Sequence, residues 1–380
     1  MSTKAKTLTA KPLTYTTKTQ ASSNYLATLA RKLGPGQRLP TMAALSEELG
    51  ISVMTLNRAL SELEAQGIVV RRQGSGTYVA DELSQTAVAL VYDRDVFGPD
   101  ASPFCSLLLH EATKLAEAND EKFNLYLTTP EIEGEPTGPP IPSDLDEAIR
   151  TKRLGGVLFA GESNPAALQW ILNQGVPLVA LSHAPVAPFR VRIDHAKVAA
   201  MGVAELAKRG CQRIALWIPA GVGIGAANVG ESFGELDAFK NALAENGLKT
   251  DEHLVLNRQQ LSANVPTTPL GSNREQGRNA AQTVFGGAPD NWPDGVVCLD
   301  DMMALGALPE MKKLGVEVGR DVQFATHTNV GSSLLVGFGE ELVLLPIDPA
   351  RVAGAMSEML EALLRGEEIG EPVIAVGPIL

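Results

Sequence analysis

The sequence predicts an α/β protein with two unlike parts: a small N-terminal unit of helices and one β-hairpin, then a larger body of parallel, doubly wound sheets. Three observations support this prediction. The chain has 380 residues, more than one typical hydrophobic core accommodates. From residue 87 onward, short apolar runs alternate with amphipathic helical segments, as expected of parallel sheets covered on both faces. Charge is also divided unevenly along the chain.

The charge division separates a basic N-terminal part from an acidic remainder. Residues 1–80 contain 10 Lys and Arg against 4 Asp and Glu, or +6; the whole chain carries -12, so residues 81–380 carry -18. A basic unit on an acidic body is expected of a protein whose small part contacts phosphates. The alternative is chance clustering with a basic tail at Lys4, Lys6 and Lys11.

Residues 20–80 predict a winged helix. Apolar residues recur at helical spacing in three segments, and two β-rich runs flank a glycine-containing turn. The predicted helices are Ala21–Leu33, Met42–Leu49 and a third from its cap Ser52 to Gly67, and the predicted hairpin pairs Ile68–Arg72 with Thr77–Val79. Residues 1–19 lack periodicity and predict a flexible tail.

The run from Gly36 to Val79 resembles the GntR family over nearly its full winged helix. The matching motifs are Arg38-Leu39-Pro40-Thr41, Leu49-Gly50-Ile51-Ser52 and Gln73-Gly74-Ser75-Gly76-Thr77. The resemblance implies a DNA-binding domain whose third helix enters the major groove with its N-terminal end. The chain departs from the family at Ala43 and Val53, where members commonly carry Arg.

The predicted DNA contacts are of three kinds. Side chains at the start of the third helix, Asn57 or Arg58 above all, are expected to read base edges. Arginines are expected to hold phosphates, and the glycine turn would let the backbone approach the minor groove. The full predicted set is Arg38, Thr41, Ser52, Met54, Thr55, Asn57, Arg58, Arg71, Arg72, Gly74 and Ser75. The alternative is a winged helix that binds protein and leaves these residues solvated.

A polar linker, residues 81–86, is predicted to lead into the body, residues 87–380. The body has too many strand–helix units for one small sheet, so we expect two lobes facing across a cleft. The predicted strands are Ala87–Tyr92, Phe123–Leu127, Gly156–Phe159, Pro177–Leu181, Arg213–Ile218, Gly295–Leu299, Val322–Thr326 and Leu342–Pro346. The predicted helices are Phe104–Asn119, Pro165–Gln174, His195–Arg209, Ser232–Asn246, Gly277–Phe285, Asp301–Leu314 and Pro349–Arg365. Residues 132–144 and 257–275 are expected to be surface loops.

The body resembles the effector domain of LacI/GalR regulators, which is related to periplasmic sugar-binding proteins. The matching motifs are Val191-Arg192-Ile193-Asp194 before a helix that ends Leu206–Gly210, and Cys298-Leu299-Asp300-Asp301 leading into a helix. The resemblance implies a two-lobed, periplasmic-binding-protein-like domain that binds a small molecule at the carboxyl ends of its strands.

The family pocket, transferred by position, is Phe104, Ser182, Glu235, Asp300 and Thr328. His183 and His327 follow strands at the same edge and join the predicted effector site. Glu235 stands where sugar-binding relatives usually carry Arg, and Thr328 where they often carry Asp. An amine or cationic ligand is therefore an alternative to a sugar or polyol, and a surface or capping role is the alternative for each residue.

No pattern predicts catalysis, a metal or a cofactor. Three cysteines without a Cys-x-x-Cys pair argue against a disulfide framework and a zinc site. The glycine run at residues 221–225 opens no helix at once, unlike a dinucleotide-binding loop. No apolar run reaches the 18 residues of a membrane span, and residues 1–14 lack the apolar centre of a signal peptide, so we expect a cytoplasmic protein with no membrane partner.

Together these features predict a homodimeric transcription regulator, a repressor, that binds double-stranded operator DNA. A small molecule, a sugar or polyol, would control its operator affinity, and half-sites would lie about one DNA turn, roughly 34 Å, apart. The alternatives are a solute-binding or enzyme-derived sensor body with a non-functional head.

Overall fold

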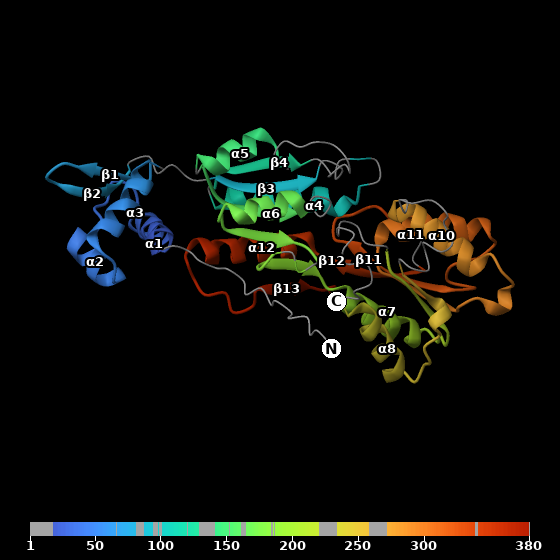
Figure 1. Ribbon diagram of the computed structural model, residues 1–380. Coiled ribbons are helices and arrows are strands. Elements are labelled where there is room, and N and C mark those ends of the chain that lie inside the picture. The colour runs from blue at the N-terminus through green and yellow to red at the C-terminus, as the bar shows by residue number, and fades with distance from the viewer. Residues whose placement is uncertain are drawn as a thin grey trace, which may run out of the picture. The chain divides into compact units, whose positions relative to one another are not determined.

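The computed structural model (Figure 1) describes residues 18–65, 67–80, 87–93, 98, 101–119, 121–128, 141–151, 153–160, 165–183, 185, 187–219, 234–257, 272–338 and 341–379. They belong to two compact units: Met1–Gln85 with Leu363–Glu368, here called the head, and Thr86–Ala362 with Ile369–Leu380, here called the body. Several predicted features lie outside the described residues: residues 1–17 of the tail, the linker, the glycine run at 221–225 and most of both long loops. Within the described residues, no helix is long and apolar enough to cross a membrane.

The head is a winged helix, as predicted. It contains α1 (Lys18–Leu33), α2 (Met42–Leu49), α3 (Val53–Ala65) and the antiparallel hairpin of β1 (Val69–Arg72) and β2 (Gly76–Val79). Buried leucines of all three helices form its core, because they repeat at the three- to four-residue spacing that places them on one face. Residues 36–39 run beside β2, where Leu39 N donates to Thr77 O at 2.9 Å. Helix α2 ends at Gly50, whose φ of 60° is the left-handed conformation that favours glycine.

The body contains two fully parallel sheets, which confirms the predicted α/β fold. The six-stranded sheet has the order β13-β7-β6-β5-β3-β4 and the five-stranded sheet the order β12-β11-β10-β8-β9. The strands are β3 (Ala87–Asp93), β4 (Phe123–Thr128), β5 (Leu154–Ala160), β6 (Leu178–Leu181), β7 (Arg190–Ile193), β8 (Ile214–Trp217), β9 (Val255–Leu256), β10 (Gly295–Cys298), β11 (Gln323–Asn329), β12 (Leu342–Ile347) and β13 (Val373–Val376). In Figure 1 the six-stranded sheet joins cyan β3 to red β13, so the last strand lies with the first strands of the body.

Helices separate the strands and cover the sheets. They are α4 (Pro103–Ala118), α5 (Ser143–Arg150), α6 (Pro165–Asn173), α7 (His195–Lys208), α8 (Glu235–Glu245), α10 (Asn273–Phe285), α11 (Asp301–Lys313) and α12 (Pro349–Leu364), with 3-10 turns η3 (Glu252–Leu254), η4 (Pro289–Asn291) and η5 (Val336–Phe338). Helices α10 and α11 cross closely, because a Cβ on Gly277 would lie 1.8 Å from Met303 O. Each sheet has its own hydrophobic cluster, so the body has two lobes.

The chain crosses between the lobes after β7 and again after β12. Helix α7 follows a strand of the six-stranded sheet but packs on the other sheet, since a Cβ on Gly202 would lie 2.8 Å from Val297 of β10. Helix α12 crosses back, because a Cβ on Gly156 of β5 would lie 2.7 Å from Leu360. After β13, Ile379 N donates to a carbonyl of β12 at 2.8 Å. The crossovers therefore lie at the carboxyl ends of the strands.

Four elements were not predicted: β7, β9, β13 and α5. The three strands have two to four residues each, and their places in the sheets depend on pairing with strands elsewhere in the chain. Helix α5 begins at Ser143 and α10 at Asn273, so the loop predictions for residues 132–144 and 257–275 are wrong at their C-terminal ends. Helix α10 begins before Gly277 because Ser272 and Glu275 form a capping box.

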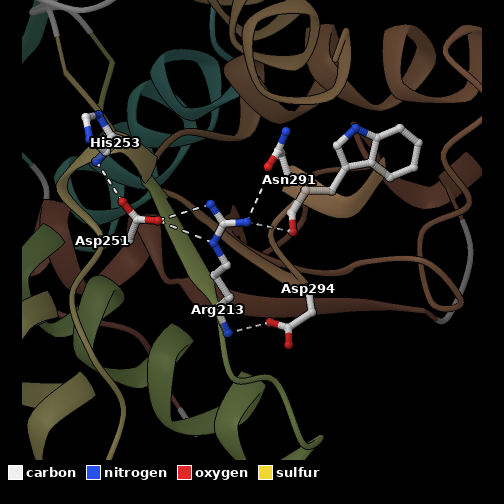
Figure 2. Close-up of polar contacts among 6 residues, drawn as sticks. Arg213, Asp251, His253, Asn291 and Asp294 are labelled. Carbon is white, nitrogen blue, oxygen red and sulfur yellow. Dashed lines mark hydrogen bonds and ion pairs between the residues drawn. The ribbon is translucent and has the colours of Figure 1, made fainter. Parts of the chain in front are cut away.

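A polar network lies at the amino ends of β8 and β10 in the five-stranded sheet, away from the carboxyl ends at which the chain crosses between the lobes (Figure 2). The Arg213 guanidinium donates to Asp251 Oδ2 at 3.1 Å and to Asn291 O at 2.8 Å, and Asp294 accepts from Arg213 N at 2.8 Å. His253 N donates to the other oxygen of Asp251 at 3.1 Å. These bonds join the start of β8 to η3, η4 and the segment before β10, so this cluster is structural.

Candidate functional sites

Helix α3 exposes a mixed apolar and polar face at its beginning. Met54 is 80% exposed and Val53 50% exposed, and Asn57 and Arg58 are also exposed. Residues three and four apart lie on the same face of a helix. Met54, Asn57 and Arg58 therefore form one surface, opposite the leucines of the head core.

Thr41, Ser52 and Thr55 shape this surface through local hydrogen bonds. Thr41 accepts from Ala44 N at 3.3 Å and caps α2. Ser52 Oγ accepts from Thr55 N at 3.2 Å and lies 2.9 Å from Thr55 Oγ1. Each side-chain oxygen satisfies a backbone donor that the first helical turn leaves unpaired. These residues hold the helix beginnings in place at the surface.

Arg71 joins α3 to the hairpin of β1 and β2, here called the wing. Its Nη2 donates to Asn57 O at 2.9 Å and to Ser61 Oγ at 3.1 Å, and its Nε lies 3.5 Å from Glu64 Oε2. The guanidinium of Arg71 therefore binds within the head, and its predicted contact with a phosphate stays a prediction. Neighbouring residues on a strand point to opposite faces, so Arg72 lies on the other face of the wing.

Arg38 and Arg72 lie at the exposed surface of the wing. The Arg72 guanidinium carbon is 4.6 Å from the centre of the Tyr78 ring, within the range of a cation–π contact. Gly76 has a φ of +124°, and a Cβ there would lie 2.9 Å from Arg38 Nε. Because residue 76 is a glycine, the Arg38 side chain can pack directly over the wing backbone at this position.

The tip of the wing is formed by Gly74 and Ser75, which are both exposed. Gly74 has a φ of +73°, which the turn requires and which residues other than glycine rarely adopt. Ser75 Oγ lies 2.7 Å from Tyr78 Oη. The tip is therefore a tight turn with little side-chain bulk.

A column of three imidazole rings lies where the two lobes meet. His183 follows β6, His195 is the first residue of α7, and His327 lies in β11. The His183 and His195 rings stack with centroids 4.7 Å apart and an interplanar angle of 13°, and the His327 ring lies 6.0 Å from His195. The column therefore runs from the six-stranded lobe through the first crossover to the five-stranded lobe.

Desolvation keeps two of these rings neutral. Burial, with a smaller effect of Arg192, lowers the pKa of His183 to about 4. Burial also lowers the pKa of His195 well below its usual value, with further lowering by His183, His327 and Arg192. Neutral imidazoles both donate and accept hydrogen bonds, so these two rings offer both functions at neutral pH.

Two adjacent carboxylates stand at the five-stranded end of the column. Asp300 caps α11, where its Oδ1 accepts from Met303 N at 2.6 Å. Burial first, and then the neighbouring Asp301, raise the pKa of Asp300 to about 6. Strongly shifted ionisable groups at the carboxyl ends of parallel strands are typical of ligand sites.

Asp301 is 1% exposed and presents one carboxylate oxygen to His327. Its Oδ2 accepts from Asn329 at 2.8 Å, and its Oδ1 has no hydrogen-bond partner and lies 3.9 Å from His327 Nε2. His327 Nδ1 lies 2.8 Å from Leu299 O, and a carbonyl only accepts, so Nδ1 carries a hydrogen. The other ring nitrogen of His327, Nε2, faces Asp301.

The structure brings His183, His327 and Asp300 of the predicted effector site together. Ser182 and Thr328 are their chain neighbours, whereas Phe104 lies in the first turn of α4 and Glu235 is the first residue of α8. The participation of these four residues in ligand binding stays a prediction. The residues that were not predicted for the site are His195, Asp301, Asn329 and Arg192. Arg192 and Asp301 lie within the two motifs of the body and His195 directly follows the first of them, so the motifs could have indicated these three residues but not Asn329.

Within the part of the chain that the structure describes, Cys105, Cys211 and Cys298 form no disulfide. Among the described residues, no group of three or more His, Cys, Asp or Glu is placed to hold a metal ion.

Two segments of the chain match known protein families. Residues 28–79 match the bacterial regulatory proteins of the gntR family, and residues 203–380 match the periplasmic binding protein-like domain. The histidine utilization repressor of Pseudomonas putida is 50% identical over 54 residues, which are 14% of this chain and 22% of that repressor. The chain spans at most about a third of the length of the histidine utilization repressors it matches.

Solved structures share the fold of the body. A regulatory protein of the LacI family from Chloroflexus aggregans has a TM-score of 0.57 and 18% identity, over 77% of this chain and 95% of that chain. The complex of the transcriptional regulator CelR with cellobiose has a TM-score of 0.56 and 20% identity, over 89% of this chain and 97% of that chain. At these identities the likeness establishes the fold.

Proposed function

We propose that this chain, which joins a gntR-type winged helix to a two-lobed body with the fold of LacI-family regulators, is a transcription regulator. Its head binds operator DNA, and a small molecule bound by its body controls that binding. The observation that carries the proposal is the exposed beginning of α3 together with the exposed arginines Arg38 and Arg72, on a basic head attached to an acidic body.

The exposed residues have distinct roles in this proposal. Asn57 and Arg58 read base edges in the major groove, Arg38 and Arg72 contact phosphates, and the glycine turn of the wing approaches the minor groove. Arg71 positions the wing. The protein acts as a homodimeric repressor on two half-sites, and operator DNA as its partner places it in the cytoplasm.

Gel-shift titration of the full chain on a duplex selected from a random library tests the head. The double variant Arg58→Ala, Arg72→Ala loses one base-reading group and one phosphate contact, so we expect no retention of the selected duplex. Arg351→Ala, which removes an exposed charge from α12, should bind as wild type does. Unchanged binding by the double variant would exclude this docking of the head.

The effector site is the histidine column with Asp300 and Asp301. Two neutral rings and a buried carboxylate oxygen without a hydrogen-bond partner suit hydroxyl groups, which can donate to the carboxylate and exchange hydrogen bonds with the rings. A sugar or polyol is therefore the proposed effector class, and the cellobiose complex of CelR supports it by fold. Because the column joins the lobes, a ligand bound there would favour one lobe arrangement, with a typical coupling of about 1–3 kcal/mol.

Thermal unfolding of the full chain with cellobiose, glucose, sucrose and sorbitol tests the body. A ligand at 100 times its Kd adds about 2.7 kcal/mol to stability, so at least one of these compounds should raise the unfolding temperature. Asp301→Asn should reduce that shift, whereas Asp290→Asn, on the exposed turn η4, should not. An equal shift in Asp301→Asn would remove Asp301 from the site.

A further inference from the structure

Val53 and Met54 form an apolar pair that the head leaves in solvent. They are 50% and 80% exposed, whereas Leu56, in the same helix, is fully buried. Scattered exposed apolar residues need no explanation. Two adjacent exposed apolar residues in the first turn of α3 do need an explanation, because the proposed function places this turn against DNA.

Polar and basic groups surround the pair. Ser52 and Thr55 bond to each other beside it, and Asn57 and Arg58 are exposed one turn further along the same face. The head as a whole is basic. A basic surface fits a phosphate backbone, and it does not resemble the apolar, charge-depleted centre of a protein interface.

The major groove presents one apolar group to such a pair, the 5-methyl group of thymine. Every other base edge there displays hydrogen-bond donors or acceptors, which Val and Met side chains cannot satisfy. Asn57 and Arg58 lie three and four residues after Met54, so they would face base pairs next to the one that Met54 contacts.

We propose that Val53 and Met54 read thymine methyl groups in each operator half-site. This inference rests on the proposed DNA-binding function and adds to it the identity of one base. Asn57 and Arg58 would select base pairs by hydrogen bonds to their edges. Val53 and Met54 would instead select thymine over cytosine by contact with the 5-methyl group.

A uracil scan of the selected operator tests the inference without changing the protein. Each thymine is replaced singly by deoxyuridine, which removes only the methyl group, and the Kd of the full chain is measured by fluorescence anisotropy. Loss of one buried methyl group corresponds to about a fourfold weaker Kd. We expect this loss at one or two thymines in each half-site, and roughly 15-fold when the equivalent thymines of both half-sites are replaced.

The double variant Val53→Ala, Met54→Ala assigns the effect to the pair. Its thymine and uracil operators should bind equally, whereas Leu33→Ala, which shortens another exposed apolar residue of the head, should preserve the difference. A wild-type protein that prefers its operator yet tolerates every uracil would overturn the inference, as would a thymine preference that persists in the double variant. Failure of the wild type to select any duplex would instead refute the proposed function, and this inference with it.

Discussion

Asp300→Asn is expected to stabilise the body at neutral pH. Asp300 caps α11 through a 2.6 Å bond from Met303 N, and burial together with Asp301 raises its pKa to about 6. Asn caps helices about as well as Asp does. The substitution therefore keeps the cap and removes a charge that the folded chain accommodates poorly.

The sign and size of the effect follow from the pKa of Asp300. The folded chain holds the proton more tightly than the unfolded chain, in which the carboxyl titrates near 3.8. The wild-type stability contributed by Asp300 therefore falls between about pH 4 and pH 6, and the loss is complete above pH 6. The difference between a pKa near 4 in the unfolded chain and about 6 in the folded chain corresponds to ~3 kcal/mol in the free energy of unfolding. Because Asp300 is half-buried, solvent screens part of this, and we expect the variant to gain roughly 1–2 kcal/mol at pH 7.5.

Urea unfolding at pH 4.0 and pH 7.5, followed by tryptophan fluorescence, measures this gain. Trp217 is fully buried in the five-stranded lobe and reports on its unfolding. Asp194→Asn is the matched control, because Asp194 caps α7 through Lys197 N at 3.1 Å and is not expected to gain stability. A variant less stable than wild type at pH 7.5, or an equal gain at both pH values, would refute the reasoning.

Three further substitutions test other parts of the structure. Arg71→Ala removes the brace between wing and α3, so the head should lose about 1–2 kcal/mol and bind its operator more weakly, as measured by thermal unfolding and anisotropy. His195→Phe keeps a ring in the column but cannot take up a proton. Because the folded chain resists protonation of His195, the wild type should lose stability as pH falls below 6.5, and the variant should lose less in urea titrations. Gly277→Ala places a Cβ 1.8 Å from Met303 O, whereas a Cβ on Gly287 meets nothing within 4 Å; the first should lower the unfolding temperature by at least the equivalent of ~1–3 kcal/mol, and Gly287→Ala should change it little.

The predictable part of the fold is the part with strong local patterns. The head helices repeat leucines on one face, and β3 begins with six buried apolar residues, Ala87–Tyr92, so both could be recognised from sequence. β7 consists of four residues in which Arg190 and Arg192 alternate with apolar ones. Its place in the sheet depends on pairing with β6 and β13, which no local pattern records.

The site was predictable where it depends on strand ends and not where it depends on long-range contacts. His183 follows β6, and His327 lies near the carboxyl end of β11; the predicted strand ends just before each of them indicated both residues. His195 joins their column because the chain crosses between the lobes at α7, a feature of the topology. The contacts of Arg71 with α3 were not predicted, because the sequence does not show which of two adjacent wing arginines faces that helix.

The Kd of the full chain for its selected operator tests the central claim most directly. It is compared with the Kd for a shuffled duplex at the same salt concentration, with and without cellobiose, glucose, sucrose or sorbitol. We predict that the selected duplex is bound at least ~10³-fold more tightly, and that one of these compounds changes its Kd by about 5–150-fold. Equal Kd values for the two duplexes, or an operator Kd that none of the four compounds changes, would contradict the claim that the body controls a sequence-reading head.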